Sequence, residues 1–532
     1  MKLPSASQMQ QLDRRASEQY GIPTIVLMEN AGVGTVRMAL DELGPCNNTF
    51  APIFVGPGNN GGDGLVIGRH LHQRGCEVMF FFLVNPEKLS GDPATNFKIV
   101  KQLKLPYHVV DTVERIGMIP MLIAQKESKG LCCYAVFDAI FGIGLCRELS
   151  GHFKKAVELI NSAAFKTKGP VIAIDIPSGL DSDSGKTLGC CVTADYTATY
   201  GCAKPAHFLH GSGSPAGKVA VIDIGIPPAV VNSGGIDTTL ATDALVKQRS
   251  TSLHRAITSH KGDNGHLFIL AGSAGKSGAA ILAAKGALRA GAGLVTLGCP
   301  IQLKDIFGSA LPEAMTFLLS GSDTCFSIDD LAVIERELAT KDVLVVGPGI
   351  GQDQRTAELI LTLYERAKCP MVIDADGLNI LALAAESLPQ PGGPRIYTPH
   401  PGELSRLIDM DSGAINQDRL EAVKLAVTKF AGSKDSVVVL KGAGTLVADG
   451  SGQRYINTTG NPGMAAAGMG DVLSGIIGAL LCQGLAPTDA ALCGVYLHGS
   501  AADMLFAAQG PGFFAGDVAD RIPCARRKLL VV

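Results

Sequence analysis

The amino-acid sequence predicts two consecutive α/β domains, each built around a largely parallel β-sheet. Hydrophobic residues make up 46% of the 532 positions, charged residues make up 18%, and 64 positions are glycine. Such a composition is typical of sheets whose two faces are both covered by helices. Short apolar runs alternate with helical stretches along both halves, which predicts right-handed crossovers between parallel strands. The length agrees with two large domains or three smaller ones, because a domain usually contains about 100–200 residues.

The first half begins with a predicted helix over residues 7–20 and continues with alternating strands and helices, including a helix over 63–74. Segment 227–250 is rich in Pro, Gly, Ser and Thr and has little periodicity, which predicts a domain boundary. The domains are therefore expected at 1–230 and 250–532. The predicted strands are 50–55, 77–84, 134–138, 171–174 and 219–223 in the first domain, and 266–271, 343–346, 371–373 and 437–440 in the second. Residues 389–394 (PQPGGP) are expected to form a surface loop.

The composition excludes several classes of protein. A net charge of −3 offers no general attraction for nucleic acids or anionic membrane surfaces. Residues 1–21 lack the apolar core of a secretory signal, and the longest apolar runs, 78–84 and 472–482, are shorter than the roughly 20 residues that cross a bilayer. The 14 cysteines are scattered without a C-x-x-C pair, which indicates reduced thiols rather than zinc ligands. These features predict a cytoplasmic protein with no nucleic-acid or membrane partner.

The first predicted strand runs directly into the glycine loop GPGNNGGDG (56–64), which is followed by a helix. A loop of this kind at a helix start presents unpaired N–H groups and therefore favours an anion. The loop also fits the G-x-G-x-x-G pattern of NAD-dependent dehydrogenases. That interpretation fails on position, because Glu77 precedes the next apolar strand instead of ending it. The polar side chains of Asn59, Asn60 and Asp63 suit a cation or a sugar better.

Two more carboxylates, Asp138 and Asp175, stand at the ends of predicted strands, and Ser178 follows closely. Ligands gather at the carboxyl ends of parallel strands, so these residues and Asn60 are expected to converge on one crevice. An all-oxygen set of ligands favours a hard cation. Each aspartate taken alone is as well explained by helix capping or by a turn.

The first half of the sequence, over roughly residues 1–227, resembles the NAD(P)H-hydrate epimerases. The resemblance rests on GIPTIVLMENAG, GPGNNGGDGLVIGRHL, DAIFGIGL, AIDIPSGLDSDSG and ADYTATYGCAKP, in this order. It implies a Rossmann-like three-layer α/β/α domain. It also implies that Asp175 is the catalytic residue facing the hydrated nicotinamide ring, and that Asn60, Asp138 and Ser178 bind a potassium ion. Ile143 and Ala206 stand where relatives often have Thr and Gly. The substrate-binding residues implied are Asn59, Asn60, Gly61, Gly62, Asp63, Gly142, Ile143, Gly144, Leu145, Cys146, Arg147, Glu148 and Asp175.

The strongest signal in the second half is the block NPGMAAAGMGD (461–471), which leads into an apolar helix. A G-x-G-D turn at a helix start places N–H donors against a transferring phosphoryl group and a carboxylate within reach of the attacking hydroxyl. The chain contains no Walker A sequence. Four further segments stand at strand ends, and each alone is equally well explained as a structural turn. They are GPG (347–349), DADGLN (374–379), TPHPGE (398–403) and KGAGT (441–445).

From about residue 260 to its end the chain resembles the NAD(P)H-hydrate dehydratases of the ribokinase-like α/β/α fold. The segments concerned are HKGDNG, AGSAGKSGAAILAAKGALRAGAGLVT, TPHPGE, LKGAGT and GNPGMAAAGMGDVLSG. The resemblance implies that ADP or ATP binds with Mg²⁺ and that Asp471 is catalytic. Ala466 and Ala467 stand where relatives usually have Ser or Thr and then Gly. The nucleotide-binding residues implied are Lys441, Gly442, Ala443, Gly444, Thr445 and Gly470, and the hydrate-binding residues are Ala279, Gly349, His400 and Asp471.

Together the resemblances imply a repair enzyme for hydrated NADH and NADPH (NADHX and NADPHX), which is expected to be a homo-oligomer. Hydroxide leaves poorly from C6 of the reduced nicotinamide, whereas phosphate leaves well. Asp471 would take the hydroxyl proton during phosphorylation, with Mg²⁺ held through Glu403. An epimerase in the first half would supply the S hydrate that the second half dehydrates. The alternatives are a non-catalytic scaffold in the first half and a small-molecule kinase in the second.

Overall fold

The computed structural model describes residues 1–430 and 435–530, and the chain forms two compact domains. The N-terminal domain comprises Lys2–Thr238, and the C-terminal domain comprises Thr239–Val532 together with Met1. The division lies within segment 227–250, where the boundary was expected. This segment is more regular than its composition suggests. It holds helix α9 (Pro228–Asn232), strand β9 (Thr238–Leu240) and helix α10 (Asp243–Arg249).

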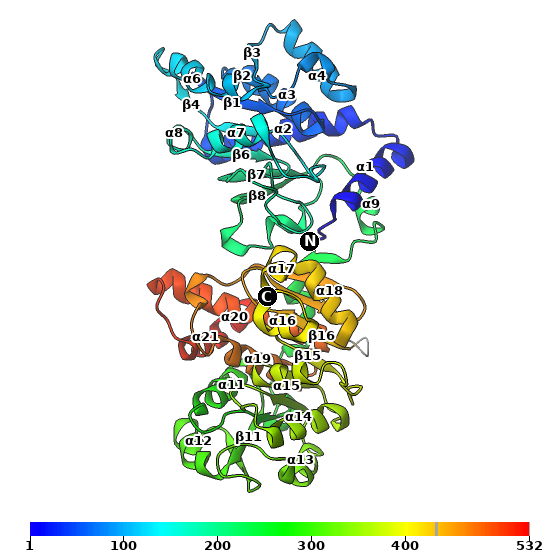
Figure 1. Cartoon of the computed structure of the whole chain (residues 1–532), viewed down its shortest axis with the longest axis vertical. Coiled ribbons are helices and arrows are strands. Elements are labelled where there is room, and N and C mark those ends of the chain that lie inside the picture. The colour runs from blue at the N-terminus through cyan, green and yellow to red at the C-terminus, as the bar shows by residue number, and fades with distance from the viewer. Residues whose placement is uncertain (431–434, 531–532) are drawn as a thin grey trace. The chain divides into compact units, whose positions relative to one another are not determined.

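The N-terminal domain is built on an eight-stranded sheet in the order β3-β2-β1-β5-β6-β7-β8, with β4 paired to β1 (Figure 1). All of these neighbouring pairs are parallel. The carboxyl ends of β1, β5, β6 and β7 therefore lie together at one edge of the sheet. The strands are β1 (Thr49–Val55), β2 (Glu77–Phe82), β3 (Tyr107–Val109), β4 (Cys132–Cys133), β5 (Val136–Ala139), β6 (Val171–Ile174), β7 (Tyr196–Tyr200) and β8 (Lys218–Ile222).

Helices cover both faces of this sheet because successive strand residues point to opposite sides. Ile53 and Phe80 pack with the apolar residues of α2, α3 and α4, whereas Phe54 and Phe81 pack with those of α5, α6, α7 and α8. Helix α1 packs against α9 through Met9 and its neighbours. The helices are α1 (Ala6–Tyr20), α2 (Thr24–Leu43), α3 (Asn59–His72), α4 (Gly91–Gln102), α5 (Val113–Ile116), α6 (Ile119–Glu127), α7 (Gly151–Ile160) and α8 (Ala163–Lys166).

The C-terminal domain is built on a ten-stranded sheet in the order β12-β11-β10-β13-β14-β15-β16-β17-β18-β9. The pairs from β12 to β16 are parallel, and those joining β16, β17 and β18 are antiparallel. The fold class predicted from the sequence is therefore confirmed in both domains. The strands are β10 (His266–Leu270), β11 (Leu294–Pro300), β12 (Met315–Leu319), β13 (Val343–Val346), β14 (Met371–Ile373), β15 (Arg395–Tyr397), β16 (Val437–Leu440), β17 (Thr445–Asp449) and β18 (Arg454–Asn457).

One face of this sheet carries a set of helices that includes α11, α19, α20 and α21. Helix α18 covers β16 and β17 and contacts α16, which in turn contacts α15. The helices are α11 (Ser277–Ala290), α12 (Lys304–Ala310), α13 (Leu331–Leu338), α14 (Gln354–Arg366), α15 (Asp376–Leu383), α16 (Pro401–Ile408), α17 (Ser412–Gln417), α18 (Arg419–Phe430), α19 (Met469–Cys482), α20 (Pro487–Gln509) and α21 (Ala515–Leu530).

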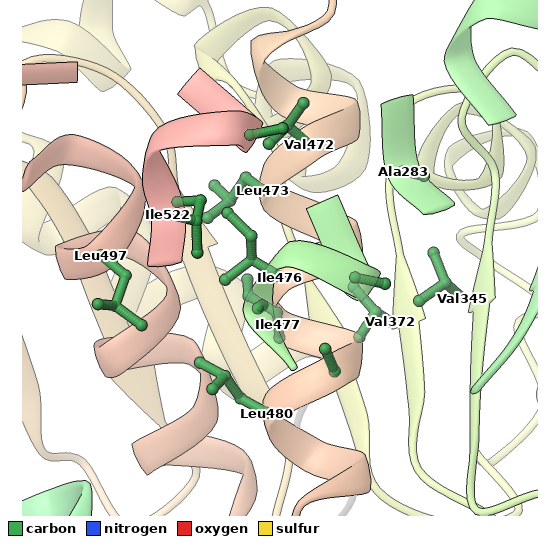
Figure 2. Packing of buried hydrophobic residues seen from close by; sticks show 14 of the residues in the cluster. Ala283, Val345, Val372, Val472, Leu473, Ile476, Ile477, Leu480, Leu497 and Ile522 are labelled. Carbon is green, nitrogen blue, oxygen red and sulfur yellow. The ribbon is translucent and has the colours of Figure 1, made fainter. Parts of the chain in front are cut away.

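Helix α19 is buried along almost its whole length and forms the centre of this core. Burying one valine, leucine or isoleucine side chain contributes roughly 1.5–3 kcal/mol to the stability of a folded protein. Close packing also depends on glycine, because a Cβ atom at Gly475 would lie 1.9 Å from the carbonyl oxygen of Ala283 in α11. The position of the first residues of α19 is thereby fixed. Figure 2 shows Val472, Leu473, Ile476, Ile477 and Leu480 of α19 among Ala283, Val345, Val372, Leu497 and Ile522.

The expected helix at 7–20 and all nine expected strands are confirmed, with ends that shift by one or two residues. One expectation was wrong. The segment 59–62 belongs to helix α3, which begins at Asn59, and not to a glycine loop ahead of the helix. Residues 389–394 form the expected surface loop, in which Gly392 packs closely: a Cβ atom there would lie 2.4 Å from the carbonyl oxygen of Glu365.

Helix α20 is long and apolar enough to cross a membrane by length and composition alone, which the search for continuous apolar runs missed. Its most apolar stretch is 72% buried inside the domain. It packs against α19 and α21 and against strands β15 to β18. The apolarity of α20 is accounted for by its place in the core of the domain.

Candidate active sites

A cavity of about 490 Å³ lies in the N-terminal domain, lined by residues that follow β1, β5, β6 and β7. Helices α1 and α2 contribute the remaining wall through residues that include Asp13 and Met28. Parallel strands collect ligand-binding residues at their carboxyl ends, as predicted. The polar residues that line the cavity are Gln10, Asp13, Thr24, Asn59, Asn60, Asp63, Asp92, Asp175, Tyr200 and Lys204.

Asp175 follows β6 directly and is paired with a buried lysine. Its Oδ1 atom lies 2.5 Å from Nζ of Lys204, whose side chain is only 1% exposed. Lys204 also donates to Oγ1 of Thr199 (2.9 Å) and to the carbonyl oxygen of Tyr200 (3.3 Å), so all three ammonium protons have acceptors. Because a buried charge is tolerated only when it is paired, the contact with Asp175 provides the partner that the buried Lys204 requires.

His207 fixes the backbone of the same residue. Burial lowers the pKa of His207 to about 4, so the imidazole is neutral near pH 7. Its Nδ1 atom accepts from the backbone N–H of Lys204 (3.0 Å), which leaves Nε2 to donate to the carbonyl oxygen of Asp175 (3.1 Å). Asp175 has a φ of 63°, which is uncommon for a residue other than glycine. Its neighbours therefore hold this aspartate in a conformation that it would rarely adopt alone.

Asp13, Asp63 and Asp92 line this cavity together with Asp175, and burial shifts the pKa of the first two. Burial raises the pKa of Asp13 to about 6. The positive charge of Lys204 opposes this rise, and the negative charge of Asp175 adds to it. Burial raises the pKa of Asp63 well above its ordinary value, and the charges of Asp175 and Asp13 raise it further. The Oδ1 atom of Asp13 is buried without a hydrogen-bond partner. Lys204 therefore contacts Asp175, whereas the two carboxyl groups with raised pKa values, Asp13 and Asp63, are not in contact with it.

Asn60, Asp138 and Ser178 surround the backbone of residues 140–142. Ser178 donates to Asp138 through its hydroxyl (2.6 Å) and through its N–H (2.8 Å), and its Oγ atom accepts from the N–H of Phe141 (2.9 Å). A Cβ atom at Gly142 would lie 3.3 Å from Oδ1 of Asn60. Both Asn60 amide atoms are buried without a partner. A buried amide with no partner is costly and calls for a ligand.

The structure brings some of the other predicted residues to this cavity and leaves others away from it. Gly142, Ile143, Gly144 and Leu145 line the cavity, whereas 146–148 are exposed and do not line it. Gly61 and Gly62 are buried beneath the helix start, where a Cβ atom would lie 2.4 Å from the carbonyl oxygen of Gly56 and 2.7 Å from Cε of Met28 respectively. Close packing therefore explains these two glycines.

In the C-terminal domain the strand ends converge on a second buried ion pair. Nζ of Lys441, which follows β16, lies 2.6 Å from Oδ1 of Asp374, which follows β14, and 3.6 Å from Oε2 of Glu403. Ser474 of α19 donates to Oδ2 of Asp374 (2.6 Å). Burial opposes the charge on both partners, but their attraction outweighs it: the pKa of Asp374 is lowered and that of Lys441 is raised. The pair is therefore charged.

Asp471 stands in the first turn of α19, close to this pair. Burial raises the pKa of Asp471 to about 7; repulsion from Asp374 raises it further, and Lys441 opposes the rise. Gly470 precedes it, and a Cβ atom there would lie only 3.3 Å from Nζ of Lys441. A carboxyl group that titrates near neutral pH is well suited to accept a proton.

The start of α19 leaves backbone donors free. Its N-cap residue Gly468 has a φ of 86° and makes no side-chain capping bond. The first N–H groups of a helix have no partner within the helix, so they form an anion site at the positive end of its dipole. Lys441 and the exposed residues Gly442 and Ala443 form the turn between β16 and β17, which Thr445 closes by donating to the carbonyl oxygen of Gly442 (2.7 Å). Arg419 stabilises this turn by donating hydrogen bonds to the carbonyl oxygens of Leu440 and Lys441.

Three residues predicted to hold the hydrate occupy helix starts or the turns beside them. Ala279 lies in the first turn of α11, and a Cβ atom at Gly349 would come within 2.9 Å of its side chain. His400 is the N-cap of α16, where its Nδ1 atom accepts from the N–H groups of Gly402 and Glu403. Oε2 of Glu403 in turn accepts from the N–H of His400 (2.8 Å). The side chains of His400 and Glu403 therefore already have structural roles.

Comparison with known proteins matches both domains to described families. Residues 24–206 match the family described as YjeF-related protein N-terminus, and residues 267–524 match the NAD(P)H-hydrate dehydratase family. The bifunctional NAD(P)H-hydrate repair enzyme of Moorella thermoacetica is 41% identical over 99% of this chain and 97% of its own length. The corresponding enzyme of Thermofilum pendens is 34% identical over 99% and 97%. The chain belongs to the family of bifunctional NAD(P)H-hydrate repair enzymes.

Among solved structures, the C-terminal domain of this repair-enzyme chain is similar to an ADP/ATP-dependent NAD(P)H-hydrate dehydratase from Bacillus subtilis co-crystallised with ATP and Mg²⁺. The two are 30% identical with a TM-score of 0.47, and the match covers 56% of this chain and all of the Bacillus chain. The family models and the full-length relatives confirm the family membership that the sequence motifs indicated.

Three polar residues of this repair enzyme were missed by the sequence analysis as site residues. Lys204 lies in the segment ADYTATYGCAKP and Asp374 in DADGLN, but neither was singled out. Asp13 lies in an amphipathic helix that carries no motif. The available signal for Lys204 was its position shortly after a predominantly buried segment. A charged side chain that is buried there requires a partner of opposite charge.

Proposed function

We propose that the chain repairs hydrated NADH and NADPH in two steps. The N-terminal domain interconverts the R and S hydrates, and the C-terminal domain uses ADP or ATP to dehydrate the S hydrate with release of phosphate. The observation that carries this proposal is the position of Asp471, a carboxyl group with a pKa of about 7, between the free N–H groups of α19 and the Lys441–Asp374 pair. This arrangement suits transfer of a phosphoryl group to a hydroxyl.

In the dehydratase step each group has a defined task. Asp471 accepts the proton of the C6 hydroxyl as its oxygen attacks the terminal phosphorus of the nucleotide. The N–H groups at the start of α19 and the ammonium group of Lys441 stabilise the negative charge that develops on the phosphoryl oxygens. The ring nitrogen then expels phosphate from C6, and loss of the C5 proton restores the reduced nicotinamide. Only the epimer whose hydroxyl points at Asp471 can react.

We further propose that Mg²⁺ enters with the nucleotide phosphates and that Glu403 is the carboxylate available to it. Mg²⁺ usually keeps several waters and takes one or two protein carboxylates together with substrate phosphates. The described residues contain no group of three or more Asp, Glu, His or Cys side chains that would form a complete metal site. One carboxylate beside a nucleotide fits that finding. When bound, the ion would neutralise charge on the phosphates.

The assay that tests this function starts from hydrated NADH of mixed configuration. With the enzyme and ADP or ATP, the absorbance of the reduced nicotinamide is expected to return completely, with one phosphate released per molecule repaired. Without nucleotide, the R:S ratio of a purified epimer is expected to relax rapidly while no reduced nicotinamide forms. A stable phosphorylated product would instead support a small-molecule kinase, and an unchanged R:S ratio would support a non-catalytic N-terminal scaffold.

Potassium is proposed as the ion beside Asn60, Asp138 and Ser178. The unpartnered Asn60 amide supports a ligand there, and burial raises the pKa of Asp138 to about 6, so a nearby cation would favour its ionised form. One carboxylate with neutral oxygens suits a large, weakly hydrated monovalent ion better than Mg²⁺.

Potassium is accordingly expected to raise the epimerase rate and the unfolding temperature of the N-terminal domain above their values in lithium at equal ionic strength. Asn60→Leu should abolish both responses, because it removes the amide without breaking any hydrogen bond of the protein. The measurements are epimer interconversion and thermal unfolding across a potassium titration. Identical behaviour of the wild type in the two salts would contradict the site.

The chain is proposed to be cytoplasmic and to act as a homo-oligomer. All 14 cysteines are free thiols, which supports a reducing compartment. The homo-oligomeric state stays a prediction.

A further inference from the structure

The chemistry of C6 inversion sets a requirement that Asp175 alone does not meet. C6 carries a hydroxyl beside the ring nitrogen, so the simplest inversion removes that hydroxyl from one face and adds water to the other. The leaving hydroxyl needs a proton on its own face, and the incoming water must lose one on the opposite face. Two acid–base groups on different walls of the cavity are therefore needed. This argument rests on the epimerase activity proposed above.

Asp13 is the candidate for the second group because it reaches the cavity from a different element. It lines the same cavity as Asp175 but comes from α1, whereas Asp175 follows β6. The Oδ1 atom of Asp13 is buried and has no hydrogen-bond partner, whereas Oδ1 of Asp175 accepts from Lys204, Thr199 and the N–H of Tyr200. A buried, unpartnered carboxyl oxygen is costly unless it serves a ligand. We propose that Asp13 is the second acid–base group of the epimerase site, acting on the face of the ring opposite to Asp175.

The charges around the two aspartates divide the roles. Lys204 forms an ion pair with Asp175, and a carboxylate in an ion pair suits the role of the base. The groups that act electrostatically on Asp13 are Lys204 and Asp175, and Asp13 in turn acts on Asp63. Burial is the largest cause that raises the pKa of Asp13, to about 6, so a useful fraction is protonated near neutral pH. Burial also raises the pKa of Asp63, but this residue lies in the first turns of α3, within the segment that the family resemblance assigns to substrate binding.

The step balances as follows. Protonated Asp13 gives its proton to the C6 hydroxyl, the C6–O bond breaks, water leaves, and the lone pair of N1 forms the N1=C6 bond of an iminium ion. Water then adds to C6 from the other face, the N1=C6 electrons return to N1, and the proton of the incoming water passes to Asp175. The net result is inversion at C6 with replacement of its oxygen, and one proton moved from Asp13 to Asp175. Proton exchange with solvent restores both groups.

The test follows inversion of a purified epimer in H₂¹⁸O, without nucleotide, by the full-length wild type, Asp13→Asn, Asp63→Asn and the control Glu18→Gln. Glu18 is an exposed carboxylate on the same helix. We expect the wild type and Glu18→Gln to incorporate ¹⁸O at each inversion, and Asp13→Asn to lower kcat about 10²-fold or more with KM unchanged. The wild-type rate should fall as the pH rises through about 6, because the acid form of Asp13 is lost, and Asp13→Asn should lack this dependence.

Three results would overturn the inference: a wild-type rate in Asp13→Asn, a loss of kcat in Asp63→Asn alone, or inversion by the wild type without ¹⁸O uptake. Misfolding is checked within the same chain, because Asp13→Asn should still dehydrate the S hydrate at the normal rate and unfold at the wild-type temperature or above. The last expectation holds because asparagine removes a carboxyl group whose ionisation the folded state disfavours. Failure of the proposed function is distinguishable, since the wild type itself would then not accelerate inversion.

Discussion

Asp471→Asn is expected to lower the rate of nucleotide-dependent dehydration about 10²–10⁴-fold, the usual contribution of a general base. The amide cannot accept the proton of the C6 hydroxyl, so the hydroxyl remains a poor nucleophile toward the phosphoryl group. The change is nearly isosteric, and the Lys441–Asp374 pair remains in place beneath it. Epimerisation should be unaffected because the other domain is unchanged. The measurement is recovery of reduced nicotinamide absorbance from the S hydrate with ADP or ATP.

The pH dependence provides a second check on the same residue. Because the pKa of Asp471 is raised to about 7, its base form becomes populated as the pH rises through 7, and wild-type dehydration should accelerate over that range. The matched control is Asp305→Asn, which removes an exposed carboxylate from the first turn of α12 in the same domain. Dehydration by Asp471→Asn at a rate close to that of Asp305→Asn would remove Asp471 from the mechanism.

Nine strands of this fold were predicted from apolar runs, whereas others, such as β11, β12 and β15, were not. Strand β15 illustrates the reason, because it begins with the completely buried residue Arg395. The Arg395 guanidinium donates to the carbonyl oxygens of Tyr364 and Ala367 at the end of α14 (2.6 and 2.7 Å). A cation in this position stabilises the helix end, where the dipole is negative. A search for apolar runs excludes such a strand because it contains a charged residue. The carbonyl groups that make its burial possible lie 31 and 28 residues earlier in the sequence.

The candidate sites show the same limit. The motifs identified Asp175, Lys441 and Asp471, because glycines and acids at strand ends leave a local pattern. They did not identify the pairings that set the charge of these groups. Lys441 and Asp374 are 67 residues apart and meet only because β14 and β16 flank β15 in the sheet. The burial that raises the pKa of Asp13 depends likewise on how α1 packs against the cavity, and no local pattern predicts it.

Backbone strain at the two sites was equally unpredictable. Asp175 has a φ of 63°, and Ala375, which separates Asp374 from Asp376, has φ 49° and ψ −118°. Side chains other than glycine rarely adopt such angles, which cost on the order of 1–3 kcal/mol. The turn at Ala375 lets Asp374 pair with Lys441 while Asp376 accepts from the N–H of Gly351 (3.0 Å) and from Gln352 (2.9 Å). The strained residue Ala375 thus separates two aspartates, Asp374 and Asp376, whose side chains bind different partners.

Asp175→Asn is expected to stop enzymatic interconversion of the two C6 epimers, again by about 10²–10⁴-fold, since the amide cannot take the proton of the incoming water. Oδ1 of the asparagine still accepts from Lys204, which limits the destabilisation that an unpaired buried lysine would cause. The double variant Asp175→Asn/Lys204→Met removes the charge pair altogether and should be equally inactive.

The decisive measurement is the time course of repair in a mixed hydrate sample with excess ADP or ATP. The wild type should restore all of the reduced nicotinamide, whereas Asp175→Asn should restore only the S fraction and then slow to the spontaneous rate of epimerisation. The control Asp223→Asn alters an exposed carboxylate that follows the neighbouring strand β8 and should behave as the wild type does. Complete recovery by Asp175→Asn at the wild-type rate would exclude this aspartate from catalysis.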